Sequence, residues 1–465
     1  MSGLTSALNI GTTGLSTNQK GIEVTGNNVS NVNTPGYSKQ TLDLTSTPTL
    51  RFNDQMIGQG AVVNSITREG NQFVTKQLID KTADYGETDA KDIPLAEIER
   101  IVGIDEADLS SDIDQFFDSW QELSTDPSGG VYRQKVMQEG NDLANSLQRM
   151  VGDLHAVQEG INDDLEGTVT DLNRQLGEIA DLNVQIVSAE TTGISANALR
   201  DQRDLLLQDV SSVAGINYFE ESNGMVSVQL SSGLPLVTAN TASNISTQWV
   251  SGSLELSLNS GASTTTLSGQ DFDGEIRGML DLRDDYVPSV IDDLDKLAYE
   301  LATSVNAVQN SGVDLDGNPG IDFFSFGNSG SDPWSGAAAT LEMVLTDTSQ
   351  VATGTIAAPG NQPGDNSNCL TMVELQNQPL INGTSSFGEF YAQIAAGVGL
   401  EVSQNSLSLD SAEDALVQMQ NMRDTTAGVS IDEEMLLLTQ YQTGYEAAAK
   451  YLTTVDEMLD TLMRM

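Results

Sequence analysis

The side chains that could carry out chemistry are few in this chain. Residues 314–318 read Asp-x-Asp-x-Asn, which is the opening of a calcium-binding loop. The sixth position of that loop is Pro319 rather than Gly, and the twelfth is Ser325 rather than Glu, so we expect an ordinary turn. His155 is the single histidine, which leaves zinc sites and Ser-His or Cys-His catalysis without their parts. We predict no enzymatic activity, no metal and no cofactor.

Cys369 is the only cysteine, so no internal disulfide framework exists. We place it in a polar loop without a basic neighbour and expect an unreactive thiol. Carboxylates occur throughout the sequence, so a pair suited to glycoside hydrolysis can be neither recognised nor excluded. A secreted polysaccharide-active protein or adhesin therefore stays open as an alternative from another functional class.

The balance of charge is extreme. The chain has 465 residues with 67 acids and 20 bases, a net charge of −47. Such a surface repels phosphate backbones and anionic lipids, so we expect neither nucleic-acid nor membrane binding. The first fifty residues hold two acids and two bases, so most of the charge belongs to the middle of the chain. The same acidity would suit a saline habitat. Aromatic residues make up 5% of the chain, which predicts small aliphatic cores.

The elements that organise the chain begin with its two ends, each of which carries a heptad pattern. Near the start, apolar residues recur every seven positions, at Leu8, Leu15, Ile22 and Val29. Near the end, they alternate steps of three and four, at Leu438, Tyr441, Tyr445, Ala448, Leu452, Val455, Leu459 and Leu462. This spacing keeps one face of a helix against a partner helix. We predict a subunit that assembles through these residues, with ends that become ordered when they meet partners.

The middle of the chain alternates between helical and extended patterns. Helical spacing covers 70–123, 141–188, 198–213, 275–310 with a break at Pro288, and residues from 387 onward. Alternating patterns predict strands in 40–66 and 215–272, with a hairpin turn at Asn223-Gly224 and a short strand at 341–346. This predicts an α+β multidomain fold: a terminal coiled-coil domain, a helix-rich domain built from both halves of the chain, and inserted β-rich modules. The predicted parts are 1–50, 51–214, 215–274, 275–310, 311–385, 386–427 and 428–465.

The N-terminal heptad pattern predicts a helix over residues 4–32, and one motif lies at its end. Residues 27–40 read Asn-Asn-Val-Ser-Asn-Val-Asn-Thr-Pro-Gly-Tyr-Ser-Lys-Gln, in which Pro35 and Gly36 redirect the chain and Tyr37 could anchor its exit. The string resembles the signature of the bacterial flagellar rod, hook and hook-associated proteins. Further segments resemble the hook-associated members of that family: 281–284, 294–298, Asn306, 317–324, 364–366, 375–376 and 428–462.

The resemblance implies a structural subunit that joins hook to filament and is needed for filament assembly. It implies export through the flagellar type III channel, which fits the absence of a visible secretory signal at the start, and a location in the extracellular flagellum. The implied partners are copies of itself, hook protein, a second hook–filament junction protein and an export chaperone at the C-terminal segment. The implied assembly interface includes Asn33, Thr34, Pro35, Gly36 and Tyr37. The alternative within this class is another axial protein, such as hook protein or flagellin.

Overall fold

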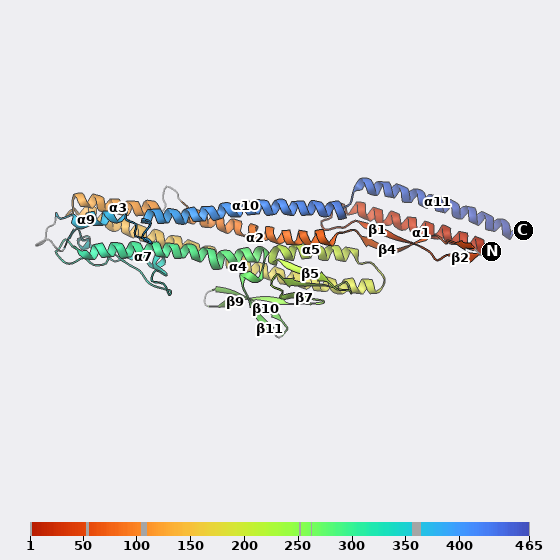
Figure 1. The fold of residues 1–465 in the computed structure, drawn as a ribbon, viewed down its shortest axis with the longest axis horizontal. Helices are drawn as coiled ribbons and strands as arrows, with labels where there is room; N and C mark the ends of the chain where they lie inside the picture. The colour runs from red at the N-terminus through yellow and green to blue at the C-terminus, as the bar shows by residue number, and fades with distance from the viewer. Residues whose placement is uncertain are drawn as a thin grey trace. The chain divides into compact units, whose positions relative to one another are not determined.

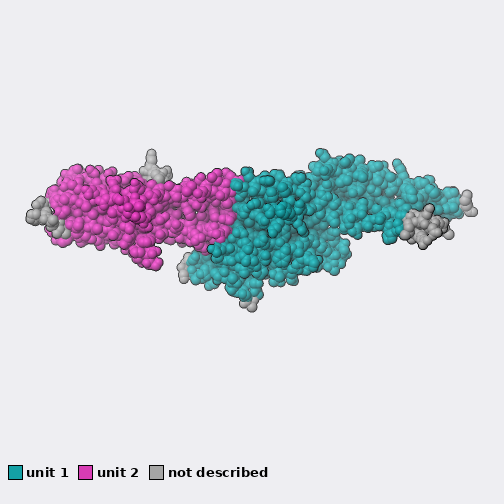
Figure 2. Space-filling view, in the orientation of Figure 1, with its two compact units in different colours: residues 1–86, 169–274, 411–465 teal, residues 87–168, 275–410 magenta. Residues whose placement is uncertain are grey.

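The computed structural model describes residues 2–52, 55–103, 109–250, 253–261, 263–355 and 364–464 (Figure 1). The chain divides into two compact units (Figure 2). Unit 1 holds residues 1–86, 169–274 and 411–465, and unit 2 holds residues 87–168 and 275–410. Each unit therefore collects segments from both halves of the sequence, and the fold is α+β and multidomain, as predicted. The finer division into seven parts stays a prediction.

The two ends of the chain form a pair of helices in unit 1. Helix α1 (Ser2–Ser30) lies alongside α11 (Ile431–Met463), and we call the two the terminal pair (Figure 1). The hairpin of β1 (Gln40–Ser46) and β4 (Ala61–Arg68) also contacts α1. A second, short hairpin is formed by β2 (Leu50–Phe52) and β3 (Gln55–Ile57). Strands in 40–66 are thus confirmed, while the first helix ends at Ser30, a little earlier than predicted.

The rest of unit 1 combines helices with two small sheets. The helices are the first part of α2 (Gln72–Val102), the second part of α4 (Gly130–Thr191), α5 (Asn197–Ala214) and the last part of α10 (Phe387–Ala427). One sheet has the order β5-β6-β7-β8 (Ile216–Glu220, Val226–Leu230, Pro235–Thr238, Thr241–Ala242), and the other has the order β11-β10-β9 (Ser263–Leu267, Ser253–Ser260, Asn244–Val250). The Asn223-Gly224 hairpin is confirmed, because Gly224 adopts a φ of 86° between β5 and β6. A single 3₁₀ turn, Gly269–Asp271, follows β11.

Unit 2 is mainly helical. It contains the later part of α2 (Gln72–Val102), α3 (Leu109–Thr125), the first part of α4, α6 (Gly274–Asp281) from Glu275 onward, α7 (Val287–Ser311), α8 (Ala337–Thr340), α9 (Ser367–Leu375) and most of α10 (Phe387–Ala427). Its strands are two residues long: β12 (Gly312–Val313), β13 (Phe324–Ser325), β14 (Glu342–Met343) and β15 (Gly354–Thr355). A 3₁₀ turn, Thr348–Gln350, lies between β14 and β15.

Three sequence expectations about unit 2 need correction. The long helix α4 begins at Gly130, eleven residues before the predicted start. The strand expected at 341–346 is only Glu342–Met343. Pro288 does not interrupt the helical backbone. A π-helical stretch, Leu282–Tyr286, connects α6 to α7 and places the proline in the first turn of α7.

The core of unit 2 is aromatic, which the low aromatic content did not predict. Its fully buried members are Phe116, Phe117, Trp120, Phe323, Phe324 and Phe387. Phe116 packs edge to face on Phe323 with 5.6 Å between ring centroids, and Phe117 stacks on Phe387 at 6.0 Å. Six of the 24 aromatic residues of the chain are thus gathered in one core.

Candidate assembly interface

The two helices of the terminal pair meet along a seam of small and polar residues on α1. Gly21 faces Tyr441, and a Cβ atom on Gly21 would lie 2.6 Å from that ring. Gly11 faces Leu452 at the same distance. Further along, Gly14 lies opposite Ala448, Asn18 opposite Gly444, and Asn28 opposite Glu434. The α1 positions 11, 14, 18, 21 and 28 follow heptad spacing, so the helices form a close-packed pair in which glycines admit large side chains of α11.

The predicted apolar stripe of α1 lies beside this seam. Leu8, Leu15, Ile22 and Val29 are displaced by roughly a quarter turn from the seam positions. Leu8 is 37% exposed, and the other three are only half-buried. The opposite flank of α1 is covered, because Val24 is buried there and the Thr17 hydroxyl donates to the Ala61 carbonyl of β4 at 3.1 Å. One apolar flank of α1 therefore stays accessible after the pair has formed.

Helix α11 buries only part of its apolar surface. Of its predicted residues, Tyr441, Ala448 and Leu452 face α1, and Val455 is 2% exposed. Leu438 and Leu459 are half-buried, whereas Tyr445 and Leu462 are exposed. Large apolar side chains also point to solvent elsewhere on this helix, at Ile431, Met435, Leu436, Tyr451, Met458 and Met463. Apolar residues on several faces indicate a helix that packs against more than one neighbour.

A buried polar network joins the base of the terminal pair. Asn28 is 1% exposed and uses its whole amide group. Its Nδ2 donates to Glu434 Oε2 at 3.0 Å and to the Gln40 carbonyl at 2.9 Å. Its Oδ1 accepts from the Gln40 backbone N–H and, at 2.8 Å, from the Tyr37 hydroxyl. The sequence analysis assigned the Asn-rich motif at residues 27–40 to turn formation. In the structure, the hydrogen bonds of Asn28 connect α1 to β1 and, through Glu434, to α11.

Charge strengthens this network. Glu434 is 1% exposed, and its Oε1 lies 3.7 Å from Lys39 Nζ, which also pairs with Glu433 at 3.1 Å. Burial raises the pKa of Tyr37 to about 12, with Asp201 and Glu434 adding to the shift, so this hydroxyl stays protonated as a donor. A buried, partly compensated carboxylate favours one register of the two helices over others, because slippage would leave the charge without its partners.

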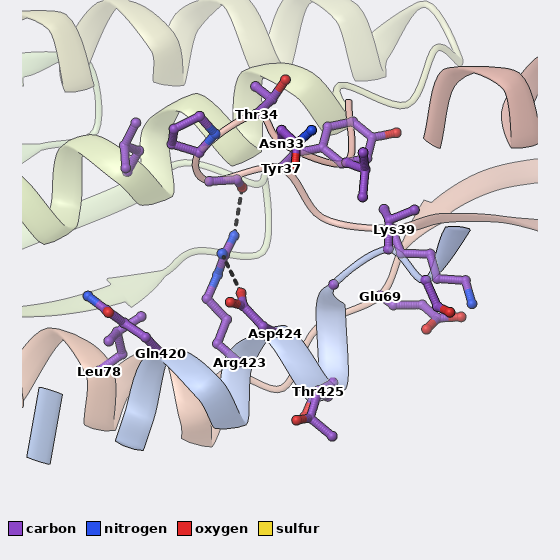
Figure 3. Close-up of a pocket in the computed structure, with 18 of the residues that line it drawn as sticks. Asn33, Thr34, Tyr37, Lys39, Glu69, Leu78, Gln420, Arg423, Asp424 and Thr425 are labelled. Atoms are coloured by element: carbon purple, nitrogen blue, oxygen red, sulfur yellow. Dashed lines mark hydrogen bonds and ion pairs between the residues drawn. The ribbon is translucent and has the colours of Figure 1, made fainter. Parts of the chain in front are cut away.

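The turn after α1 borders a cleft. Asn33, Thr34 and Pro35 are exposed, while Gly36 adopts a φ of 77° and its carbonyl accepts from Arg423 Nη2 at 2.7 Å (Figure 3). The cleft has a volume of about 740 Å³ and is also lined by residues 428–430, between α10 and α11. The predicted turn residues are thus accessible, and Arg423 fastens the turn to the end of α10.

Among the described residues, the side chains considered earlier for metal binding or catalysis have structural roles. Asp314 Oδ1 accepts from the Asn318 backbone N–H at 2.7 Å, which closes a turn. His155 is exposed and bonds Gln158. The predicted polar loop around Cys369 is wrong: Cys369 is buried in α9 near Arg133, and burial raises its pKa to about 12, which keeps the thiol protonated. No three His, Cys, Asp or Glu side chains of the described chain gather so that they could hold a metal ion. None of the described helices combines the length and apolar character needed to span a membrane.

Family models match three parts of the chain. The flagellar hook-associated protein FlgK helical domain matches residues 95–324. The flagella basal body rod protein model matches residues 8–37, and the flagellar basal body rod FlgEFG protein C-terminal model matches residues 424–465. Both ends of the chain thus resemble axial proteins in general, and the middle resembles one class of them.

Relatives align over nearly the full length. Flagellar hook-associated protein 1 of Bacillus subtilis is 28% identical over 97% of this chain and 96% of its own. The protein of the same name from Salmonella typhimurium is 23% identical over 99% of this chain and 100% of its own. The solved structure of the flagellar hook junction protein FlgK from Burkholderia pseudomallei shares the fold with a TM-score of 0.68 and 18% identity, covering 76% of this chain and 100% of that chain.

The chain belongs to the flagellar rod, hook and hook-associated proteins, within the hook-associated protein 1 family. It is a structural component of the bacterial flagellum, of the class that joins hook and filament. The family is one of structural proteins.

Proposed function

We propose that this chain occupies the hook–filament junction and assembles there through the faces of the terminal pair that remain accessible. Copies of the chain would pack by the α1 stripe of Leu8, Leu15, Ile22 and Val29 and by the outward faces of α11. Hook protein on one side and a second junction protein on the other would use the same helical ends. The observation that carries the proposal is that glycines and polar residues form the α1 side of the α1–α11 seam, while Leu8 and Leu15 of α1 remain outside it.

Charge supports the use of α1. This helix contains one lysine and one glutamate, whereas the chain as a whole has a net charge of −47. Copies that approach through α1 bring together a nearly neutral surface. Helix α11 contains seven acids and one lysine, so contacts through its outward faces meet repulsion between like charges. The same argument makes assembly easier when salt screens the remaining charge.

Single substitutions on the accessible faces test the proposal. Leu8→Asp on α1 and Leu436→Asp on α11 place a charge on the proposed contact at residues that are 37% and 72% exposed. Leu407→Asp is the matched control, because Leu407 is 68% exposed on α10 outside the terminal pair. All three should leave the circular dichroism and melting temperature of the dilute chain nearly unchanged, since exposed substitutions cost about 0.5 kcal/mol or less.

In the bacterium that carries this chain, Leu8→Asp and Leu436→Asp should produce hooks without filaments, with filament subunits released into the medium. Leu407→Asp should produce normal filaments. Deletion of residues 430–465 should give the same defect as the two terminal substitutions, in a harsher form. Normal filaments on cells that carry Leu8→Asp and Leu436→Asp together would contradict the proposed interface.

The C-terminal segment is also the proposed chaperone site. Before export, the apolar side chains that α11 exposes would need a cover in the cytoplasm, and residues 428–465 would supply the binding segment for an export chaperone. Co-purification of the flagellar export chaperone with the full chain, and its loss on deletion of 430–465, would support this. Equal recovery with both chains would place the chaperone elsewhere.

A further inference from the structure

Unit 1 contains a second cleft, next to the terminal pair, in which positive charge gathers. Its volume is about 530 Å³, and five cationic residues line it: Arg68, Lys76, Arg200, Arg203 and Arg423. The acids that line it are Glu69, Asp204 and Glu220. The whole chain has only 20 bases against 67 acids, so a quarter of its cations meet at one place. We call this the basic cleft.

We infer that the basic cleft binds an oxyanion: a carboxylate or a small inorganic anion such as sulfate. This goes beyond assembly through the terminal helices and does not depend on it. The inference rests on positive groups that the chain's own acids do not fully compensate: Arg203, Lys76 and the start of α2.

Three of the five cations are already paired. Arg68 Nη1 donates to Asp201 at 3.0 Å and to Asp204 at 2.6 Å. Arg200 binds Glu190 at 2.8 Å and also pairs with Glu220. Arg423 lies 3.5 Å from Asp424 and donates to the Gly36 carbonyl. These three arginines shape the wall of the cleft, because each guanidinium already has its own acceptors.

Arg203 is the buried cation that lacks full compensation. It is 1% exposed, and its Nη1 donates to the neutral oxygens of Asn183 at 3.1 Å and Gly224 at 2.8 Å. The nearest carboxylate, on Glu220, lies 3.7 Å from Nη2. Within the described part of the chain, the Nε atom has no hydrogen-bond partner. Burial lowers the pKa of Arg203, which means that its charged form is poorly solvated where it stands.

The start of α2 adds a second, independent attraction for an anion. Residues 70–72 and 74–76 line the basic cleft, and α2 begins there at Gln72. Asn71 Oδ1 accepts from the Phe73 backbone N–H at 3.0 Å, and the first turn of α2 contains no acidic residue. A long helix presents partial positive charge and unpaired N–H groups at this end. Lys76 is exposed there and makes no ion pair within 4 Å among the described residues.

Two sources can supply such an anion. The first is an acidic side chain of another copy of this chain, whose surface carries abundant carboxylates. The second is a free inorganic anion from the medium. Both would meet the same groups, Arg203, Lys76 and the start of α2, so separate probes are needed to distinguish them.

The test is isothermal titration calorimetry of the dilute full-length chain at constant ionic strength maintained with sodium chloride. The probes are sodium sulfate and an acetylated, amidated triglutamate peptide. We expect saturable binding of at least one probe, weakened about threefold to fivefold by Lys76→Gln, as for loss of one exposed ion pair. Lys20→Gln is the matched control, because Lys20 is an exposed lysine of unit 1 outside the basic cleft.

Arg203→Met should abolish binding in a variant whose circular dichroism shows it to be folded. If that variant does not fold, the comparison of Lys76→Gln with Lys20→Gln decides. Binding of triglutamate would identify an acidic segment as the ligand, and binding of sulfate alone would identify a free anion. No saturable binding of either probe, or equal weakening by Lys76→Gln and Lys20→Gln, would overturn the inference. Because the dilute chain is used, this result is independent of whether the terminal pair mediates assembly.

Discussion

The core of unit 2 and the terminal pair bury their apolar side chains to very different extents. In unit 2, six aromatic side chains from α3, α10 and the segment after α7 are almost completely buried against one another. In the terminal pair, only Glu434 and Val455 of α11 are buried, and large apolar side chains remain outside. The comparison shows that one region completes its packing within the chain, whereas the other has surface left for neighbours.

The difference is also one of side-chain size at the contact. Unit 2 fills its core with phenylalanine and tryptophan, which remove large areas from water. The α1 side of the terminal pair uses Gly11, Gly14 and Gly21, which contribute little area but let α11 approach closely. Glycine also weakens a helix, by about 1 kcal/mol per residue relative to alanine. The terminal pair thus holds together by close packing and a few polar bonds, and Leu8 and Leu15 of α1 remain available to neighbours.

The largest expected effect comes from breaking the aromatic core. Phe116→Ala removes a ring that contacts Phe117, Trp120 and Phe323, so it should destabilise unit 2 by about 3–5 kcal/mol. Urea unfolding followed by tryptophan fluorescence would measure it, since Trp120 reports on this core. A loss below about 1 kcal/mol would show that the region relaxes around the cavity, and the contrast with the terminal pair would weaken.

A smaller effect is expected at the seam of the terminal pair. Gly21→Val places side-chain atoms where the Tyr441 ring lies, and overpacking of this kind costs about 1–3 kcal/mol. The matched control is Gly26→Ala on the same helix, because nothing lies within 4 Å of that position; it should raise stability by about 0.5–1 kcal/mol. Hydrogen exchange of α1 amides would compare the two.

Partial recovery of amide protection in Gly21→Val combined with Tyr441→Ala would sharpen the assignment, because the smaller side chain leaves room for valine. If Gly21→Val and Gly26→Ala behaved alike, the close seam described for α1 and α11 would be wrong.

The smallest expected effect concerns pH. The pKa of Tyr37 rises from 10.0 to about 12 in the folded chain, so its contribution to stability is fully present below pH 10 and is lost as pH rises from about 10 to about 12. Tyr37→Phe should reduce the slope of stability against pH in that window. Tyr218 and Tyr286 shift in the same direction and will keep part of the slope in the variant. An unchanged slope in Tyr37→Phe would remove this residue from the network at the base of the terminal pair.

Much of the architecture could be predicted from local pattern. The helical spacing of α4 and α11 and the Asn223-Gly224 hairpin are local signals, and the structure contains the corresponding elements. The heptad step of Tyr441, Ala448 and Leu452 identified residues that face α1. The same reasoning selected Leu8 and Leu15 on α1 for their size, whereas the seam is formed by the glycines between them. Periodicity identifies a face only when large residues mark it, and here the close contact needed small ones.

The sequence by itself determined the helical ends and the acidic middle, because these follow from residue spacing and charge along the chain. It indicated the class of the protein only through the resemblance of residues 27–40 to flagellar axial subunits. Only the tertiary structure decided that Asn28 bonds Glu434 across 406 positions and that five of the scarce cations surround one cleft. Such pairings depend on which distant segments fold together. Side-chain hydrogen bonds and buried charges act over a few ångströms in space, and separation along the chain does not reveal them.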